Sequence, residues 1–140
     1  MYQVAPIDIW VKEVRNRPGE LADILSQLKA AGSNLEFVVA RPHDAGSSVV
    51  FVAPLLSDQE IRVAKQLGLE KSANMHAVRV GGSDEAGLGA RVTRILAEAK
   101  INVRGLTGAA IGGRSVIYVR FESSTDAQRG REALRANLGL

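Results

Sequence analysis

The spacing of apolar side chains alternates between two periods along the chain, and each change of period marks a new element. Ile7, Ile9 and Val11 occupy every second position, which is the period of a strand with one buried face. Apolar residues then recur at helical spacing over 21–28, and Gly32 is placed to end that helix. The start of the chain therefore predicts a strand followed by an amphipathic helix.

Two further strands follow the first helix. Leu35, Phe37 and Val39 occupy every second position, residues 43–47 form a turn cluster, and residues 49–52 make a more continuous apolar strand. These features predict a hairpin.

Two capping boxes mark the starts of later helices. Ser57 and Glu60 can satisfy each other's backbone amides, and Gly68 is placed to stop the helix that follows them. Thr125 and Gln128 have the same spacing and predict the start of the last helix.

The sequence matches itself at an offset of 68 residues, which slips to 67 in the later part. The matched pairs are Gly19 with Gly87, Ala22 with Ala90, Leu28 with Leu96, Ala31 with Ala99, Asn34 with Asn102, Ser48 with Ser115, Val49 with Val116, Val52 with Val119 and Leu67 with Leu134. Self-similarity at a long period indicates two copies of one supersecondary unit.

We expect one module over residues 1–74 and a second over residues 75–140, with no linker between them. Residues 69–80 must then hold the last strand of one module and the first strand of the next. Only Gly139 and Leu140 follow the final helix, so the closing strand of the second module is predicted to be missing.

The order strand, helix, strand, strand, helix, strand predicts an α+β fold, the ferredoxin-like βαββαβ sandwich with both helices on one face. A module of roughly 68 residues buries only a modest core, so we expect the two modules to associate as an internal pseudo-dimer. The open edge left by the missing strand must be covered. We expect a homodimer, or a neighbouring strand of the same chain, at that edge.

Composition excludes several classes of protein. Hydrophobic residues make up 46% and charged residues 24%, which is typical of soluble globular domains. The chain has no cysteine, so disulfides and thiolate zinc sites are excluded and a cytoplasmic location is the default expectation. No apolar run is long enough to cross a membrane, and the start lacks the pattern of a signal peptide.

Charge gives no reason to expect nucleic-acid binding. Residues 7–74 hold 8 basic and 9 acidic side chains, a net of −1, whereas residues 75–140 hold 10 and 6, a net of +4. Arginines on one predicted helix account for much of the excess, and a solvated polar face explains them. We therefore expect no nucleic-acid partner.

No pattern of residues predicts catalysis or a metal site. His43 lies in a predicted turn and His76 on a predicted strand, and neither has a carboxylate or second histidine at ligand spacing. No spacing brings together a nucleophile with a base, or an acid with a base. We expect a protein that is not an enzyme and holds no cofactor and no metal.

The segment that joins the first strand to the first helix has the chemistry to bind a free amino acid. Pro18 suits a first helical turn, and Gly19 permits close approach of a ligand. The first-turn amides and the helix dipole attract a carboxylate, while Asn16 can accept from an ammonium group. The same residues also make an ordinary capped helix start, which is the alternative.

This segment resembles the ACT domain family, whose pattern is Asp/Asn-x-Pro-Gly-x-Leu, an amphipathic helix, a short turn and an Asn-Ile/Leu pair. The first copy matches through residues 16–22 and 32–35. The second copy keeps an acid and a glycine in residues 84–88 but lacks the proline, and residues 102–103 keep the strand entry. The resemblance covers nearly the whole chain, once per repeat.

ACT domains are allosteric modules that commonly pair side by side and bind an amino acid at their interface. The resemblance implies one site at Asn16, Pro18, Gly19, Glu20 and Leu21 with Asn102 and Val103, and a pseudo-symmetric site at Asp84, Gly87 and Leu88 with Asn34 and Leu35. Gly81-Gly82-Ser83 precedes the second loop, which predicts a more pliable loop and weaker binding there.

We therefore expect a regulatory protein of two tandem ACT-like modules that binds a free amino acid reversibly. The bound state would change its association with a metabolic enzyme or with another copy of itself. The alternative is a regulatory or interaction subunit of a metabolic enzyme whose ACT fold binds nothing. The intact first loop favours binding, and the altered second loop favours the alternative.

Overall fold

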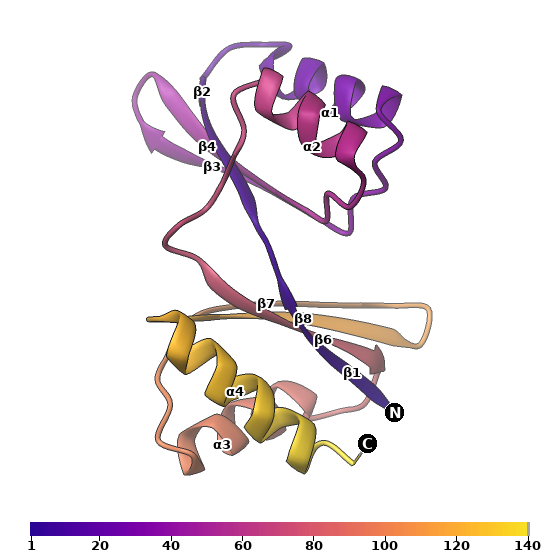
Figure 1. Cartoon of the computed structure of the whole chain (residues 1–140), viewed down its shortest axis with the longest axis vertical. Coiled ribbons are helices and arrows are strands. Elements are labelled where there is room, and N and C mark those ends of the chain that lie inside the picture. Colours follow the sequence, from indigo (N-terminus) through magenta and orange to yellow (C-terminus); the bar gives the residue numbers. More distant parts are fainter. Residues whose placement is uncertain (140) are drawn as a thin grey trace. The chain divides into compact units, whose positions relative to one another are not determined.

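In a computed structural model that describes residues 1–139, the chain folds into two compact α+β units (Figure 1). The inserted unit comprises Asp8–Ser72, and the split unit comprises residues 1–7 together with the chain from Ala73 onward. Leu140, the end of the predicted second module, lies outside the described residues. No helix in the described part of the chain is long and apolar enough to cross a membrane.

The inserted unit has the predicted order of elements. They are β2 (Trp10–Arg15), α1 (Glu20–Ala30), β3 (Phe37–Asp44), β4 (Ser47–Ala53), α2 (Asp58–Gln66) and β5 (Glu70–Lys71). The four strands form one antiparallel sheet in the order β3-β4-β2-β5. The predicted ferredoxin-like sandwich is confirmed in this unit.

The core of the inserted unit lies between one face of this sheet and its two helices. It is built from Trp10, Val14, Ile24, Leu28, Val50, Val52, Leu55, Ala64 and Leu69. The expected strand with Ile7, Ile9 and Val11 on its buried face is wrong, because β1 ends at Ile7 and β2 begins at Trp10. The chain passes from one sheet to the other between these strands, so the alternation does not continue across the gap.

The capping box at the start of α2 is confirmed. The Glu60 amide donates to the Ser57 hydroxyl at 3.1 Å, and the Ser57 amide donates to the Glu60 carboxylate at 3.3 Å. The buried carboxylate also accepts from the Ser33 hydroxyl at 3.0 Å and from the Leu56 amide. Glu60 therefore connects the turn after α1 to the first turn of α2.

The split unit repeats the same architecture with a different chain path. Its elements are β1 (Tyr2–Ile7), β6 (His76–Ser83), α3 (Leu88–Glu98), β7 (Val103–Ile111), β8 (Arg114–Phe121) and α4 (Ser124–Asn137). The sheet order is β1-β6-β8-β7, and all neighbours are antiparallel. Both helices cover one face of this sheet (Figure 1).

Strand β1 closes the sheet of the split unit. It pairs with β6 from Tyr2 opposite Gly82 to Ile7 opposite Ala77, the place that β5 takes beside β2 in the other unit. The closing strand predicted to be missing is thus supplied by residues 2–7. A neighbouring strand of the same chain was one of the two coverings expected for this edge. The units accordingly divide after residues 7 and 72 and not at the single boundary expected between residues 74 and 75.

The N-cap of helix α4 lies two residues earlier than the predicted cap, Thr125. Ser123 is the N-cap, and its hydroxyl accepts from the Asp126 amide at 3.1 Å, so the capping box expected at Thr125 and Gln128 is wrong. The helix also reaches β1, because the Arg135 Nε donates to the Val4 carbonyl at 3.0 Å. The last helix and the first strand of the chain therefore belong to one packed unit.

Candidate functional site

The two strand–helix loops that carry the predicted site residues are anchored in the same way. In the inserted unit the Asn16 amide donates to the Gly46 carbonyl at 2.9 Å, and in the split unit the Asp84 amide donates to the Gly113 carbonyl at 2.9 Å. Each bond fixes the loop to the turn of the hairpin beside it. The repeat seen in the sequence is therefore also a repeat of loop geometry.

A left-handed glycine begins the helix after each loop. Gly19 has φ of 92° and Gly87 has φ of 82°, a region that strains other residues. A Cβ atom at either position would meet nothing within 4 Å, so the backbone angle and not crowding requires glycine. Because Gly19 is the N-cap, Pro18 precedes the cap. The prediction that Pro18 lies in the first helical turn is therefore wrong.

Neither α1 nor α3 has a side-chain cap at its N-terminus. The amides of a first helical turn have no acceptor within the helix, and the helix dipole makes this end positive. Both loops consequently present N–H groups with the electrostatics of an anion site.

In the split unit this helix start faces an open hollow of about 320 Å³. One side of the hollow is the β6–α3 loop and first turn, with Asp84, Glu85, Gly87, Leu88 and Gly89. The other side is formed by β7 and β8, chiefly Leu106, Gly108, Ala110, Ser115 and Ile117. Three of the predicted site residues, Asp84, Gly87 and Leu88, therefore line one concave surface.

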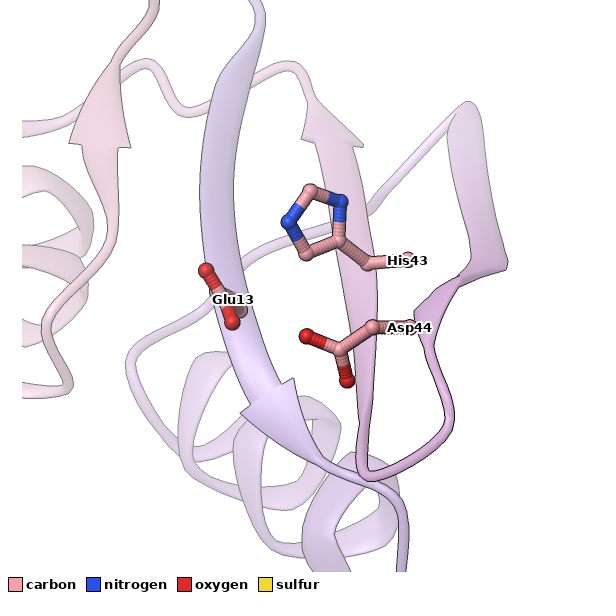
Figure 2. Close-up of side chains that lie close together, drawn as sticks. All are labelled: Glu13, His43 and Asp44. Carbon is pink, nitrogen blue, oxygen red and sulfur yellow. The ribbon is translucent and has the colours of Figure 1, made fainter.

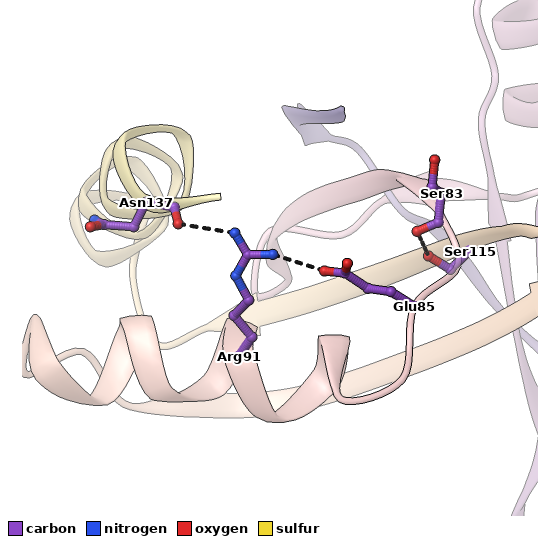
Figure 3. A network of polar contacts seen from close by, with 5 residues as sticks. All are labelled: Ser83, Glu85, Arg91, Ser115 and Asn137. Atoms are coloured by element: carbon purple, nitrogen blue, oxygen red, sulfur yellow. Dashed lines mark hydrogen bonds and ion pairs between the residues drawn. The ribbon is translucent and has the colours of Figure 1, made fainter. Parts of the chain in front are cut away.

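The Glu85 carboxylate at this hollow is held by two partners. Arg91 of α3 contacts it at 2.8 Å and also donates to the Asn137 carbonyl at 3.5 Å (Figure 3). The hydrogen bond from the Tyr2 hydroxyl lowers the pKa of Glu85, burial opposes this shift, and Arg91 reinforces it. Burial, followed by the bond to Glu85, raises the pKa of Tyr2.

Asp84 differs from its neighbour Glu85. Within the described residues, no hydrogen bond or ion pair engages its carboxylate, and the residue is exposed at the edge of the hollow. Fixed N–H groups and an uncommitted carboxylate therefore lie along the same surface. Such an arrangement can bind a group that carries both a negative and a positive charge.

The matching loop of the inserted unit has a different charge pattern. Arg17 forms an ion pair with Glu20, one of the predicted site residues, and Asn16 is exposed. Leu21 is half-buried and packs against the core of that unit.

The predicted partners of these loops lie at the entries to the second strands. Asn34 and Asn102 are exposed in equivalent positions before β3 and β7, and Leu35 and Val103 are half-buried against their own cores. The expected sites pair residues of different units, so the pairing of Asn102 with the first loop and of Asn34 with the second stays a prediction.

The expected pliability of Gly81-Gly82-Ser83 is wrong. These residues are the end of β6; both glycines are buried and paired on both sides, and Ser83 pairs with Arg114 of β8. A Cβ atom at Gly82 would lie 2.6 Å from the Met1 carbonyl oxygen and 2.6 Å from the Tyr2 ring. Glycine is needed here for close packing, so the second loop leaves a firmly held strand.

A group of exposed polar side chains gathers on the inserted unit, outside these loops. Figure 2 shows Glu13 of β2 beside His43 and Asp44 of β3, with ligand-type atoms within 4.8 Å of one another. The expectation that His43 has no carboxylate at ligand spacing is therefore wrong, because the sheet brings Glu13 of β2 close to His43 and Asp44 of β3. Asp44 already accepts from the Gly46 amide and the Ser47 hydroxyl, which lower its pKa. Its role in the turn accounts for its position.

Sequence analysis missed Tyr2, Glu85 and Arg91, which fix the shape and charge of the loop. The only available signal was the alternation of Tyr2 and Val4 with polar or exposed neighbours, which is the pattern of a strand. Nothing in that alternation specifies a partner strand more than 70 residues away.

Comparison with known proteins identifies the fold. The family model for the ACT domain matches residues 76–139. No curated protein matches the sequence significantly. A solved structure of a protein from Bacteroides thetaiotaomicron aligns with a TM-score of 0.76 at 14% identity, covering 95% of this chain and 89% of that one. The ligand-free regulatory subunit of aspartate kinase from Thermus thermophilus aligns with a TM-score of 0.62 at 12% identity, covering 98% and 95%.

Proposed function

We propose that this chain, of which residues 76–139 match the family model for the ACT domain, is an amino-acid-binding regulatory protein without catalytic activity of its own. The observation that carries the proposal is the hollow beside the β6–α3 loop. Ligand sites span about 300 to 1,000 Å³, so a hollow of about 320 Å³ suits a single small molecule.

The two charges of a free amino acid match the two kinds of group along this hollow. The ligand carboxylate would accept from the first-turn amides that follow Leu88, because the Leu88 amide itself donates to the Glu85 carbonyl at 3.3 Å, and the helix dipole adds a favourable field there. The ligand ammonium would donate to the Asp84 carboxylate, a charge-assisted bond. The family resemblance further suggests that a second ACT module covers the ligand with the start of its second strand, Asn34 and Leu35 for this loop. Asn102 and Val103 would serve the loop at Asn16.

Regulation requires that the ligand bind two states of the protein with different affinity. We propose that ligand binding changes association with a cytoplasmic metabolic enzyme or with another copy of this chain. The regulatory subunit of aspartate kinase from Thermus thermophilus shares the fold, which supports an enzyme partner.

The proposal is tested by calorimetric titration of the twenty common amino acids into the wild-type chain and two loop variants. Asp84→Ala removes the proposed ammonium partner and should weaken binding by about 1.5 to 3 kcal/mol, roughly tenfold to hundredfold. Asn16→Ala is the matched change in the other loop and should weaken binding less if the split unit holds the ligand. Light scattering with and without ligand would report a change of assembly.

A wild-type chain that binds no amino acid at millimolar concentration would contradict the proposal. The alternative would then take its place: a regulatory or interaction subunit that associates with a metabolic enzyme without a ligand of its own.

A further inference from the structure

We infer that the hollow of the split unit selects a neutral amino acid with a short apolar side chain, and that Gly108 and Ala110 set this preference. The inference rests on the proposed function and adds the chemical class of the ligand. It comes from the strand side of the hollow, opposite the loop that takes the two charges.

Strand register decides which residues form the floor of the hollow. Gly108 lies opposite Ile117 and Ala110 opposite Ser115, so both face the same side of the sheet as Ile117 of the core. Leu106, two residues before Gly108, is 42% exposed on that side. The floor is therefore apolar apart from Ser115, whose hydroxyl donates to the Ser83 carbonyl at 3.3 Å, and it is open where β7 carries no large side chain.

Gly108 keeps the middle of the floor empty. A Cβ atom placed there would lie 3.5 Å from the Ile117 Cγ1, an ordinary contact, with the next nearest atom at 3.9 Å. Gly108 does not have the positive φ that would itself require glycine. A larger side chain at this position would therefore be tolerated by the strand and would occupy space in the hollow.

In the inserted unit, the positions equivalent to Gly108 and Ala110 carry larger side chains. Its register places Ala40 opposite Val50 and Pro42 opposite Ser48, the positions equivalent to Gly108 and Ala110. Each small residue of the split unit is thus matched by a larger one. The difference makes the floor shallower in the inserted unit, although its loop keeps the better family motif.

Charge at the hollow restricts the ligand's side chain. Asp84 and Glu85 both lie on the loop side, and the described residues that line the hollow include no lysine or arginine. An acidic side chain would meet carboxylates without a cation to offset them. A basic side chain extending over the floor would find no carboxylate there, because Glu85 is already engaged by Arg91 and Tyr2. A short apolar side chain fits against Leu106 and Ile117.

The experiment compares alanine, valine, aspartate, lysine and phenylalanine as ligands by calorimetry. We expect the wild-type chain to bind alanine or valine at least tenfold more tightly than the other three. Gly108→Val should then weaken valine binding at least tenfold, and Gly108→Ala should weaken it less. Ala40→Val, the equivalent position in the inserted unit, should leave the affinity unchanged.

Near-UV circular dichroism of Tyr2 and Tyr118 would show whether each variant keeps the split unit folded. If the Gly108→Val substitution disrupts the strand, the smaller substitution Gly108→Ala still tests the role of the floor. Equal or tighter binding of aspartate or lysine would overturn the inferred selectivity while leaving amino-acid binding intact. Unchanged affinity in both Gly108 variants would overturn the role of the floor. Absence of binding by any amino acid would instead defeat the proposed function and this inference together.

Discussion

At the scale of single residues, Glu60 shows how a charged side chain is held in a small core. Only 8% of the residue is exposed. Burial alone would raise its pKa, but hydrogen bonds from Ser33, Leu56 and Ser57 outweigh burial and lower it. Because the folded pKa lies below the unfolded value, the stabilising contribution is present above the unfolded pKa. It is lost as pH falls through the folded pKa.

We expect Glu60→Ala to lower the free energy of unfolding of the inserted unit by about 1 to 2 kcal/mol at pH 7, because three donors lose their acceptor. Trp10 is the only tryptophan and lies in the core of that unit, so its fluorescence in urea follows this unfolding step. The difference from wild type should shrink as the pH falls below about 4, the ordinary range for a glutamate, and should be lost once the pH passes the lowered pKa of folded Glu60. An equal difference at pH 3 and pH 7 would contradict the assigned role of the charge.

At the scale of elements, the packing of α4 on the sheet of the split unit depends on the absence of a side chain at Gly130. A Cβ atom at Gly130 would lie 2.6 Å from the Phe121 ring and 3.3 Å from the Leu96 Cδ2. Both neighbours are buried in the core, so neither can move cheaply. Glycine disfavours helices by about 1 kcal/mol relative to alanine. Close packing therefore outweighs helix propensity at this position.

Gly130→Ala should destabilise the split unit by about 1 to 3 kcal/mol, the usual cost of overpacking, despite the gain in helix propensity. Gly89→Ala is the matched control, because it also lies in a helix but a Cβ atom there meets nothing within 4 Å. We expect the control to be neutral or stabilising by up to about 1 kcal/mol. Urea unfolding monitored by the near-UV signal of the two tyrosines, both in this unit, measures the effects. Equal stability of the two variants would show that α4 can shift away.

At the scale of the whole molecule, the inserted unit interrupts the chain of the split unit. Both described ends of the chain belong to the split unit (Figure 1). There the Arg135 Nε of α4 donates to the Val4 carbonyl of β1. Transfer of residues 1–7 to the C-terminus would convert the chain into two consecutive βαββαβ modules. Permutations of this kind succeed where chain ends lie close together.

A permuted chain that begins at Asp8 and carries residues 1–7 behind a short flexible linker after residue 140 should keep both folded units. Near-UV dichroism and tryptophan fluorescence should match the wild type. Deletion of residues 1–7 is the control and should destabilise the split unit, because β6 then loses one of its two neighbouring strands, while the Trp10 signal is retained. A permuted chain as unstable as the deletion would mean that β1 must enter the sheet from its natural connection.

Sequence alone specified the features that depend on neighbours in the chain. The α1 stripe and the Ser57–Glu60 cap are local patterns, and both were predicted correctly because helical contacts span only three or four residues. The destination of β1 was not predictable, because its alternation fits any sheet edge of suitable polarity. The hollow was likewise not predictable. It depends on Gly108, and only the folded sheet places β7, which carries Gly108, beside the loop at Asp84.

The placement of β1 has a consequence for the order in which the protein can form during synthesis. β1 leaves the ribosome before the other described elements, and its contact with α4 spans 131 residues of chain. At about 5 to 20 residues per second, roughly 7 to 26 seconds of translation separate the two partners. The inserted unit is complete long before then and can fold while Tyr2 and Val4 still lack their sheet. β1 therefore stays unpaired until β6 has been made and lacks its contact with α4 until still later, and its waiting time is set by translation of the segment that separates it from these partners.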